Sequence, residues 1–141
     1  MLTEWVYKYV LYPFNRKPAM SETVAVLGAS PKRERYSNQA IRLLRDYGHT
    51  VLPVNPAQQE IEGLRVIASV DGLAPGQVDT VTMYVSPAHS DALLPGLLRL
   101  KPKRVIFNPG AENLRLEQEL EKAGIQVEEA CTLVLLRTGQ Y

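Results

Sequence analysis

The chain has 141 residues, of which 45% are hydrophobic and 22% charged, and its formal net charge is +1. This length predicts one domain, with a core large enough to need no disulfide or metal for stability. The apolar content and low net charge exclude a disordered chain. The near-neutral charge also disfavours a general polyanion binder, so we expect no nucleic-acid partner.

Cysteine and histidine are scarce: the chain contains one cysteine, Cys131, and two histidines, His49 and His89. A single cysteine excludes an internal disulfide framework and a multi-cysteine zinc or iron–sulfur site. The two histidines lie forty residues apart, without metal-ligand spacing, so we expect no metal site. No long apolar run and no signal-peptide pattern occur, which predicts no membrane span and a cytoplasmic location.

Residues 1–22 differ in pattern from the rest of the chain. Apolar residues recur at helical spacing and prolines follow them, so we expect an amphipathic helix that ends at these prolines. Its apolar face could pack on the main domain, form a homodimer contact or lie on a membrane surface. Lys8 is the only basic residue near its polar face, which disfavours the membrane surface. The apolar residues are Leu2, Trp5, Val6, Tyr9 and Val10, and the prolines are Pro13 and Pro18.

Residues 23–141 form the predicted main domain, in which short β-branched runs alternate with helical patterns. Such alternation predicts an α/β, Rossmann-like doubly wound domain, with a mostly parallel five- or six-stranded sheet in a three-layer α/β/α sandwich. The expected strands are Thr23–Leu27, Thr50–Val54, Thr80–Val85, Arg104–Phe107 and Ile125–Val127. The expected helices are Ser37–Tyr47, Ser90–Leu100 with Leu93, Leu94, Leu97 and Leu98 inward, and Glu112–Ala123.

Other segments are less regular. Ser37 is the expected N-cap of the first helix and Gly48 its C-terminal cap. Residues 57–78 are expected to hold a loop with a short strand, and residues 131–136 either a strand or a helix.

Four of the expected strands are followed by small, turn-forming or amide residues. In an open parallel sheet, ligands bind beyond the carboxyl ends of the strands. Backbone N–H groups and a helix start at Ser37 could hold a phosphate there, with Lys32, Arg33 or Arg35 adding charge. A turn alone explains any one of these segments, but the four together favour a nucleotide site. They are Gly28–Arg33, Asn55-Pro56, Ser86-Pro87 and Asn108-Pro109-Gly110.

The common nucleotide fingerprints are absent. After Gly28 the next glycine is Gly48, so there is no G-x-G-x-x-G. The second strand ends in Val54-Asn55-Pro56, without the acidic residue that binds the ribose of NAD. The P-loop pattern is also missing. NAD, NADP and ATP hydrolysis are therefore disfavoured.

Five segments, in their order and spacing, resemble the CoA-binding domain family. This family comprises small single-domain relatives of the N-terminal domain of succinyl-CoA synthetase alpha subunits. The resemblance runs from about Thr23 to the C-terminus and implies binding of coenzyme A or an acyl-CoA across the carboxyl edge of the sheet. The segments are VAVLGAS (24–30), GHTVLPVNP (48–56), YVSPAHS (84–90), VIFNPGAEN (105–113) and AGIQVEEAC (123–131).

The resemblance also implies where the parts of CoA would lie. The loop after the first strand would face the phosphates, the loop after the second would lie near adenine and ribose, and the later loops would border the pantetheine. The synthetase-type second loop carries a lysine, whereas Ala57-Gln58-Gln59 stand here. The implied binding residues are Gly28, Ala29, Ser30, Lys32, Arg33, Tyr36, Ser37, Asn55, Pro56, Ser86, Pro87, Asn108, Pro109 and Gly110.

No catalytic residue is predicted. Synthetases of this kind use a phosphorylated histidine from a second domain, for which this chain has no room. His89 is expected to face solvent unless it approaches the ligand, and Cys131 to lie in the core unless it forms a mixed disulfide with CoA. We therefore predict non-catalytic binding of CoA or acyl-CoA, as a sensor or regulator. The alternatives are a detached CoA-binding subunit of an acyl-CoA synthetase-like enzyme, an NAD(P)-binding redox protein, or a fold that serves interaction only.

Overall fold

The computed structural model describes residues 21–141. The predicted N-terminal helix and its dimer contact fall on residues 1–20 and lie outside the described part. The described chain forms a five-stranded sheet with the order β2-β1-β5-β6-β7, in which every pairing is parallel. The sheet is therefore wholly parallel. Its strands are β1 (Thr23–Leu27), β2 (Thr50–Val54), β5 (Thr80–Met83), β6 (Arg104–Phe107) and β7 (Gln126–Glu129).

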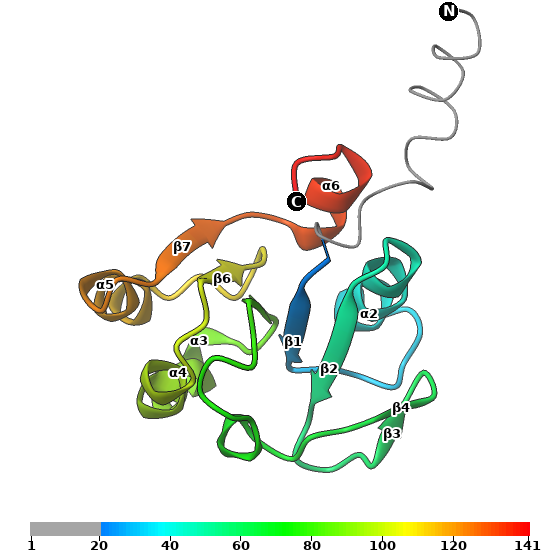
Figure 1. Cartoon of the computed structure of the whole chain (residues 1–141), viewed down its shortest axis with the longest axis horizontal. Helices are drawn as coiled ribbons and strands as arrows, with labels where there is room; N and C mark the ends of the chain where they lie inside the picture. The colour runs from blue at the N-terminus through cyan, green and yellow to red at the C-terminus, as the bar shows by residue number, and fades with distance from the viewer. Residues whose placement is uncertain (1–20) are drawn as a thin grey trace, which may run out of the picture.

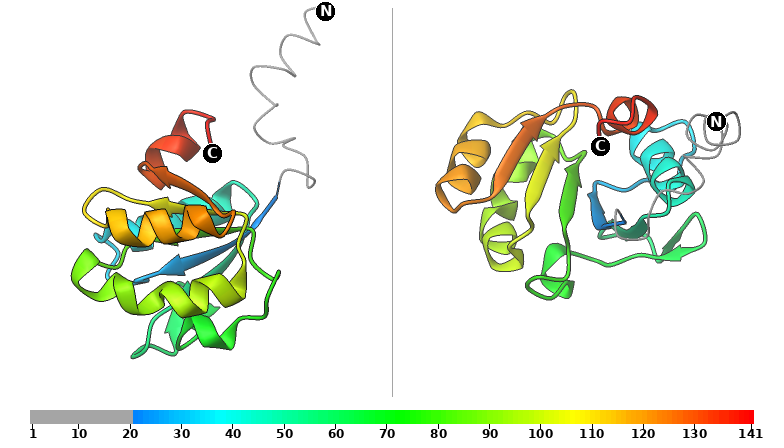
Figure 2. Two further views of the ribbon diagram at one scale, coloured as in Figure 1. Left: turned by 90° about the vertical axis from the view of Figure 1, so that its left-hand side faces the viewer. Right: turned by 45° about the horizontal axis from the view of Figure 1, so that its top comes forward.

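Helices cover both faces of the sheet, as the predicted three-layer fold requires (Figures 1 and 2). On one face, α2 (Tyr36–Asp46) contacts α6 (Thr132–Arg137), and on the other α4 (Leu94–Leu100) contacts α5 (Leu114–Lys122). Successive β1 residues alternate between the two cores: Val24 and Val26 pack toward α2 and α6, and Ala25 and Leu27 toward α4 and α5. Burial on both faces explains why β1 is continuously apolar.

The first helix begins one residue earlier than predicted. Arg35 is its N-cap and makes no side-chain capping bond, whereas Ser37 lies buried within the first turn. The prediction that Ser37 caps α2 was therefore wrong. The predicted C-terminal signal is confirmed, since Gly48 has a φ of +88° and donates to the carbonyl of Arg45 at 2.9 Å.

The segment predicted as the helix 90–100 is divided into three pieces. α3 (Pro87–Ser90) and the 3-10 helix η5 (Asp91–Leu93) precede α4, in which Pro95 occupies the first turn. Proline lacks the N–H that a longer helix would need at that position, so the helical ladder restarts there. Leu97 is buried as predicted, but Leu98 is exposed and Leu100 takes the inward position instead.

The segment 57–78 holds more regular structure than the sequence indicated. β3 (Glu60–Ile61) and β4 (Leu64–Arg65) form a small antiparallel hairpin, and the 3-10 helix η4 (Val70–Gly72) follows. Ile67 makes an isolated parallel bridge to Val54, which fixes the hairpin beside the end of β2. Residues 132–137 are helical, which decides between the two options left open for that stretch.

Candidate functional site

The strand order reverses between β1 and β5, because the chain runs from β1 outward to β2 and then returns to β5 on the other side. Beyond the carboxyl ends of the two strands at such a switch point, open α/β sheets bind their ligands. A pocket of about 440 Å³ lies at this position. Its lining residues are Gly28, Ala29, Ser30, Arg35, Tyr36, Ser37, Asn55, Tyr84, Ser86, Pro109, Gly110 and Ala111.

Gly28 allows the β1 loop and the end of β5 to approach each other closely. Its φ is +84°, and a Cβ at this position would lie 3.0 Å from the carbonyl carbon of Tyr84. Both facts exclude a larger side chain. Gly28 therefore lets the two backbone segments pack together at the floor of the pocket. This packing role is independent of any contact with a ligand.

The start of α2 presents uncapped amides and a cation to the pocket. Because Arg35 makes no side-chain capping bond, the first-turn N–H groups remain available to an anion. Arg35 lines the pocket, whereas Lys32 and Arg33 do not. Arg33 instead forms an ion pair with Glu62 at 4.0 Å and lies largely in solvent. Of the three basic residues that were expected to add charge, only Arg35 lines the pocket.

Asn55 lies at the pocket, but its amide is already used by the protein. Its side-chain N–H donates to the carbonyl of Ala29 at 2.8 Å, and its side-chain oxygen accepts from the backbone N–H groups of Ala57 (2.6 Å) and Gln58 (3.1 Å). Asn55 therefore holds the loops after β1 and β2 together, and a ligand would meet the loops that it positions.

Asn108 also points inward rather than toward the pocket. It is 1% exposed, donates to the hydroxyl of Thr82 at 2.7 Å and accepts from the N–H of Thr132 at 2.8 Å. The expected binding residue therefore holds the start of α6 to β5. Pro87 lies outside the pocket lining as well, and Pro56 borders a separate hollow.

Tyr84 and Ala111 line the pocket but were not among the expected binding residues. Tyr84 directly follows β5, and its ring packs against the core between α2 and α6. Burial raises the pKa of its hydroxyl, whose oxygen has no hydrogen-bond partner among the described residues. The strand was predicted to run from Thr80 to Val85, so Tyr84 was assigned to the strand itself, whereas β5 ends at Met83.

No residue that lines the pocket is a carboxylate, a histidine or a cysteine. The Ser86 hydroxyl lies 3.0 Å from Nδ1 of His89, but both side chains are exposed and belong to one short turn. Cys131 is half-buried at the start of α6. In residues 21–141, no three acidic, histidine or cysteine side chains gather as a metal site, and no helix there is long and apolar enough to cross a membrane.

A sequence model of the family described as "CoA binding domain" matches residues 22–137. The chain therefore belongs to the CoA binding domain family, as its five sequence segments predicted.

Several known proteins resemble the chain in sequence or in structure. YneT of Bacillus subtilis (strain 168), an uncharacterized protein, is 30% identical over 64 residues, which is 45% of this chain and 47% of YneT, so the match spans about half of that relative. A crystal structure of an uncharacterized protein is 39% identical with a TM-score of 0.81, covering 86% of this chain and 98% of that one. The apo form of dinucleotide forming acetyl-coenzyme A synthetase 1 from Ca. Korarchaeum cryptofilum is 25% identical with a TM-score of 0.62. That match covers 74% of this chain and 25% of the synthetase chain.

Proposed function

We propose that the protein binds coenzyme A or an acyl-CoA in the pocket between the ends of β1 and β5, without transforming it. The observation that carries the proposal is the composition of this pocket in a member of the CoA binding domain family. It joins a loop of small residues, the uncapped start of α2 and one free cation, Arg35.

The diphosphate of CoA suits this arrangement. Backbone N–H groups at a helix start attract anions through their partial positive charge. Ser30 and Ser37 add hydroxyl groups at the same edge, and Arg35 can pair with a phosphate oxygen by a charge-assisted hydrogen bond.

Tyr36 suits the less polar parts of the ligand. Its side chain is 70% exposed at the pocket, although large apolar groups gain free energy when they are covered. Stacking on the adenine or packing against the pantetheine would cover its ring.

The pocket lining supports binding rather than catalysis. Acyl or phosphoryl transfer needs a nucleophile or a proton-transferring group within hydrogen-bond reach of the reacting atoms. The nearest pair of this kind, Ser86 and His89, is exposed, and no third described side chain hydrogen-bonds to the other ring nitrogen. Binding without turnover suits a sensor or regulator of CoA.

Isothermal titration calorimetry of the full chain tests the proposal. CoA and acetyl-CoA should bind with one site per chain, whereas NAD and ATP should give no heat of binding. CoA should also raise the melting temperature by mass action. Absence of binding by either CoA species at about 0.1 mM protein, where a Kd tighter than about 0.1 mM gives a measurable isotherm, would contradict it.

A second candidate function is that of a CoA-binding subunit of an acyl-CoA synthetase-like enzyme. The similarity to one quarter of an acetyl-coenzyme A synthetase chain favours it. Such a subunit would need a partner chain that binds and phosphorylates the acyl group. Purification of the tagged protein from its native cells, in the presence of CoA, should then recover a chain with an ATP-grasp sequence, and the pair should form acyl-CoA from acid, CoA and ATP. Recovery without any such chain argues against this candidate.

A further inference from the structure

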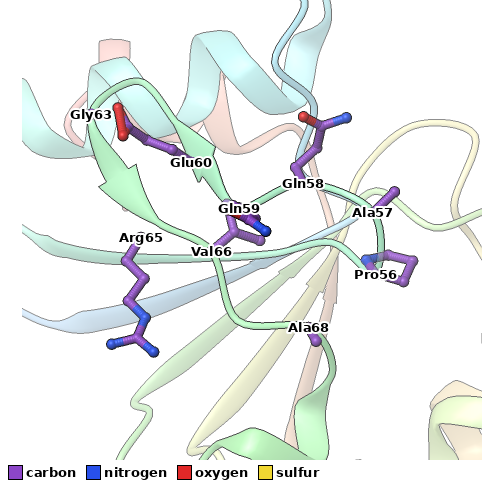
Figure 3. Close-up of a pocket in the computed structure, with 9 residues that line it drawn as sticks. All are labelled: Pro56, Ala57, Gln58, Gln59, Glu60, Gly63, Arg65, Val66 and Ala68. Atoms are coloured by element: carbon purple, nitrogen blue, oxygen red, sulfur yellow. The ribbon is translucent and has the colours of Figure 1, made fainter.

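A second hollow, of about 780 Å³, is formed by the loop after β2 and the β3–β4 hairpin. Asn55 lines the first pocket and Pro56 lines the second, so the two are separated by consecutive residues of one loop. A ligand that crosses this loop would therefore occupy both. The second hollow is lined by Pro56, Ala57, Gln58, Gln59, Glu60, Gly63, Arg65, Val66 and Ala68 (Figure 3).

Arg65 is the only cationic residue in the lining of this hollow. It is exposed, and among the described residues its guanidinium has no hydrogen bond and no ion pair. Glu60 stands opposite Arg65 in the hairpin register, yet no ion pair joins them. In Figure 3 the Arg65 side chain extends away from the hairpin, whereas that of Glu60 runs along it toward Gly63.

The other arginines near the hairpin are already engaged. Arg45 donates to the carbonyl of Glu62 at 2.8 Å, Arg42 donates to the carbonyl of Arg33 at 2.9 Å, and Arg33 pairs with Glu62. Arg65 thus differs from its neighbours in having a complete set of unused donors. A guanidinium presents these donors in a planar fork that matches two oxygens of a phosphate.

We infer that Arg65 binds the ribose 3′-phosphate of CoA and so selects CoA over its 3′-dephospho form. The inference rests on the proposed function, since CoA carries two separate anionic groups, a diphosphate and a 3′-phosphate on the ribose. With the diphosphate at Arg35 and the start of α2, the phosphorylated ribose crosses Asn55-Pro56 and enters the hollow that Arg65 lines. Val66 and the methyl group of Ala68 offer apolar surface beside it for the adenine.

The test compares the affinities of CoA and 3′-dephospho-CoA, measured by calorimetry at one fixed salt concentration. The wild-type protein should bind CoA at least about tenfold more tightly, the difference that one charge-assisted contact typically gives. Arg65→Gln should remove this preference by weakening CoA binding, and should leave dephospho-CoA within about twofold of wild type. Arg65→Lys should retain part of the preference, because the charge remains without the planar fork.

Arg45→Gln is the matched control. It removes the same charge from the same region, but Arg45 donates to the hairpin backbone and does not line the hollow. Its ratio of CoA to dephospho-CoA affinity should equal that of wild type. An equal affinity of the wild-type protein for both ligands, or an equal loss in the two variants, overturns the inference while CoA binding stands. Binding of neither ligand to the wild-type protein overturns the proposed function itself, and the inference with it.

Discussion

The side-chain amide of Asn55 donates a hydrogen bond to the backbone carbonyl of Ala29 at 2.8 Å, across the ends of β2 and β1. A parallel backbone bond, from the N–H of Ala29 to the carbonyl of Val54 at 3.2 Å, joins the same two loops. The loops after β1 and β2 are therefore held as one unit. In the proposed CoA site, the role of Asn55 is therefore to position these loops.

Asn55→Ala should lower both stability and affinity for CoA. It removes the acceptor for the exposed N–H groups of Ala57 and Gln58, and it leaves the part-buried carbonyl of Ala29 without its side-chain donor, which costs about 1–3 kcal/mol of unfolding free energy. Chemical denaturation and calorimetry measure the two effects. Asn55→Asp keeps the acceptor for Ala57 and Gln58 but loses the donor to Ala29 and adds a negative charge beside the proposed phosphate site, so its affinity should fall below that of Asn55→Ala. Unchanged affinity in both variants would show that the loops keep their positions without Asn55.

Arg35→Gln should weaken CoA binding by about tenfold, since it removes the cation that lines the switch-point pocket. Arg33→Gln provides the comparison, because Arg33 is two residues away in sequence but pairs with Glu62 outside the pocket. Titrations at two salt concentrations should show that the affinity for CoA depends less on salt in Arg35→Gln than in the wild-type protein, whereas Arg33→Gln should keep the wild-type salt dependence. Equal effects of both substitutions would mean that only the overall positive charge of the loop matters.

Ser30→Phe should abolish CoA binding with little change in melting temperature. The Ser30 side chain is partly exposed at the pocket, so a bulky ring there fills the space of a phosphate without disturbing the core. Ser30→Ala keeps that space and should bind CoA within about tenfold of wild type, the loss of at most one hydrogen bond. Thermal unfolding with and without CoA measures both quantities. A normal CoA-induced stabilisation of Ser30→Phe would place the ligand elsewhere.

Glu117 predicts a pH dependence of stability. The residue is 6% exposed, and burial, followed by the neighbouring carboxylates of Glu129 and Glu121, raises the pKa of its side chain above the ordinary 4.5, although the N–H of Asn113 opposes this. The folded state therefore binds this proton more tightly than the unfolded state. The stability that the proton confers is complete below about pH 4.5 and is lost as pH rises through the folded-state pKa.

Glu117→Gln should remove this loss, because the amide stays neutral and its oxygen can still accept from the N–H of Asn113. The variant should melt at a higher temperature than wild type at about pH 7, and the difference should shrink toward about pH 4. Glu121→Gln, on the exposed side of the same helix, removes one of the carboxylates that raise this pKa, so it should give a smaller gain in melting temperature at about pH 7. A variant less stable than wild type at every pH would contradict this account.

The sheet could be predicted because the short apolar runs in the sequence coincide with the buried strands of the structure. The strands β1, β2 and β6 have the predicted bounds, since each is a short apolar run ended by a turn residue. The hairpin β3–β4 could not be predicted, because a strand of two residues is too short to show an alternating pattern. The division of the predicted helix 90–100 depends on where Pro95 falls within the helical ladder, which the leucine pattern alone does not show.

For the site, the sequence predicted that four loops would meet at one edge of the sheet, where a pocket lies, but it could not predict the direction of each side chain. Asn55 and Asn108 were expected to bind the ligand, yet their amides hold loops and strands together. The basic residues 32–35 are adjacent in sequence, and only the backbone path into α2 decides that Arg35 lines the pocket. Arg65 was not singled out, because only the hairpin brings it next to the loop after β2.

The central claim is that CoA binds at the carboxyl edge of the sheet, and amide NMR of the labelled protein tests it most directly. Addition of CoA should shift the backbone signals of Gly28, Ser30 and Ser37, which border the switch-point pocket. The signals of Thr50 and Lys103, at the opposite ends of the strands, should stay in place. Shifts confined to that opposite edge, or no shifts with CoA in large excess, would contradict the account.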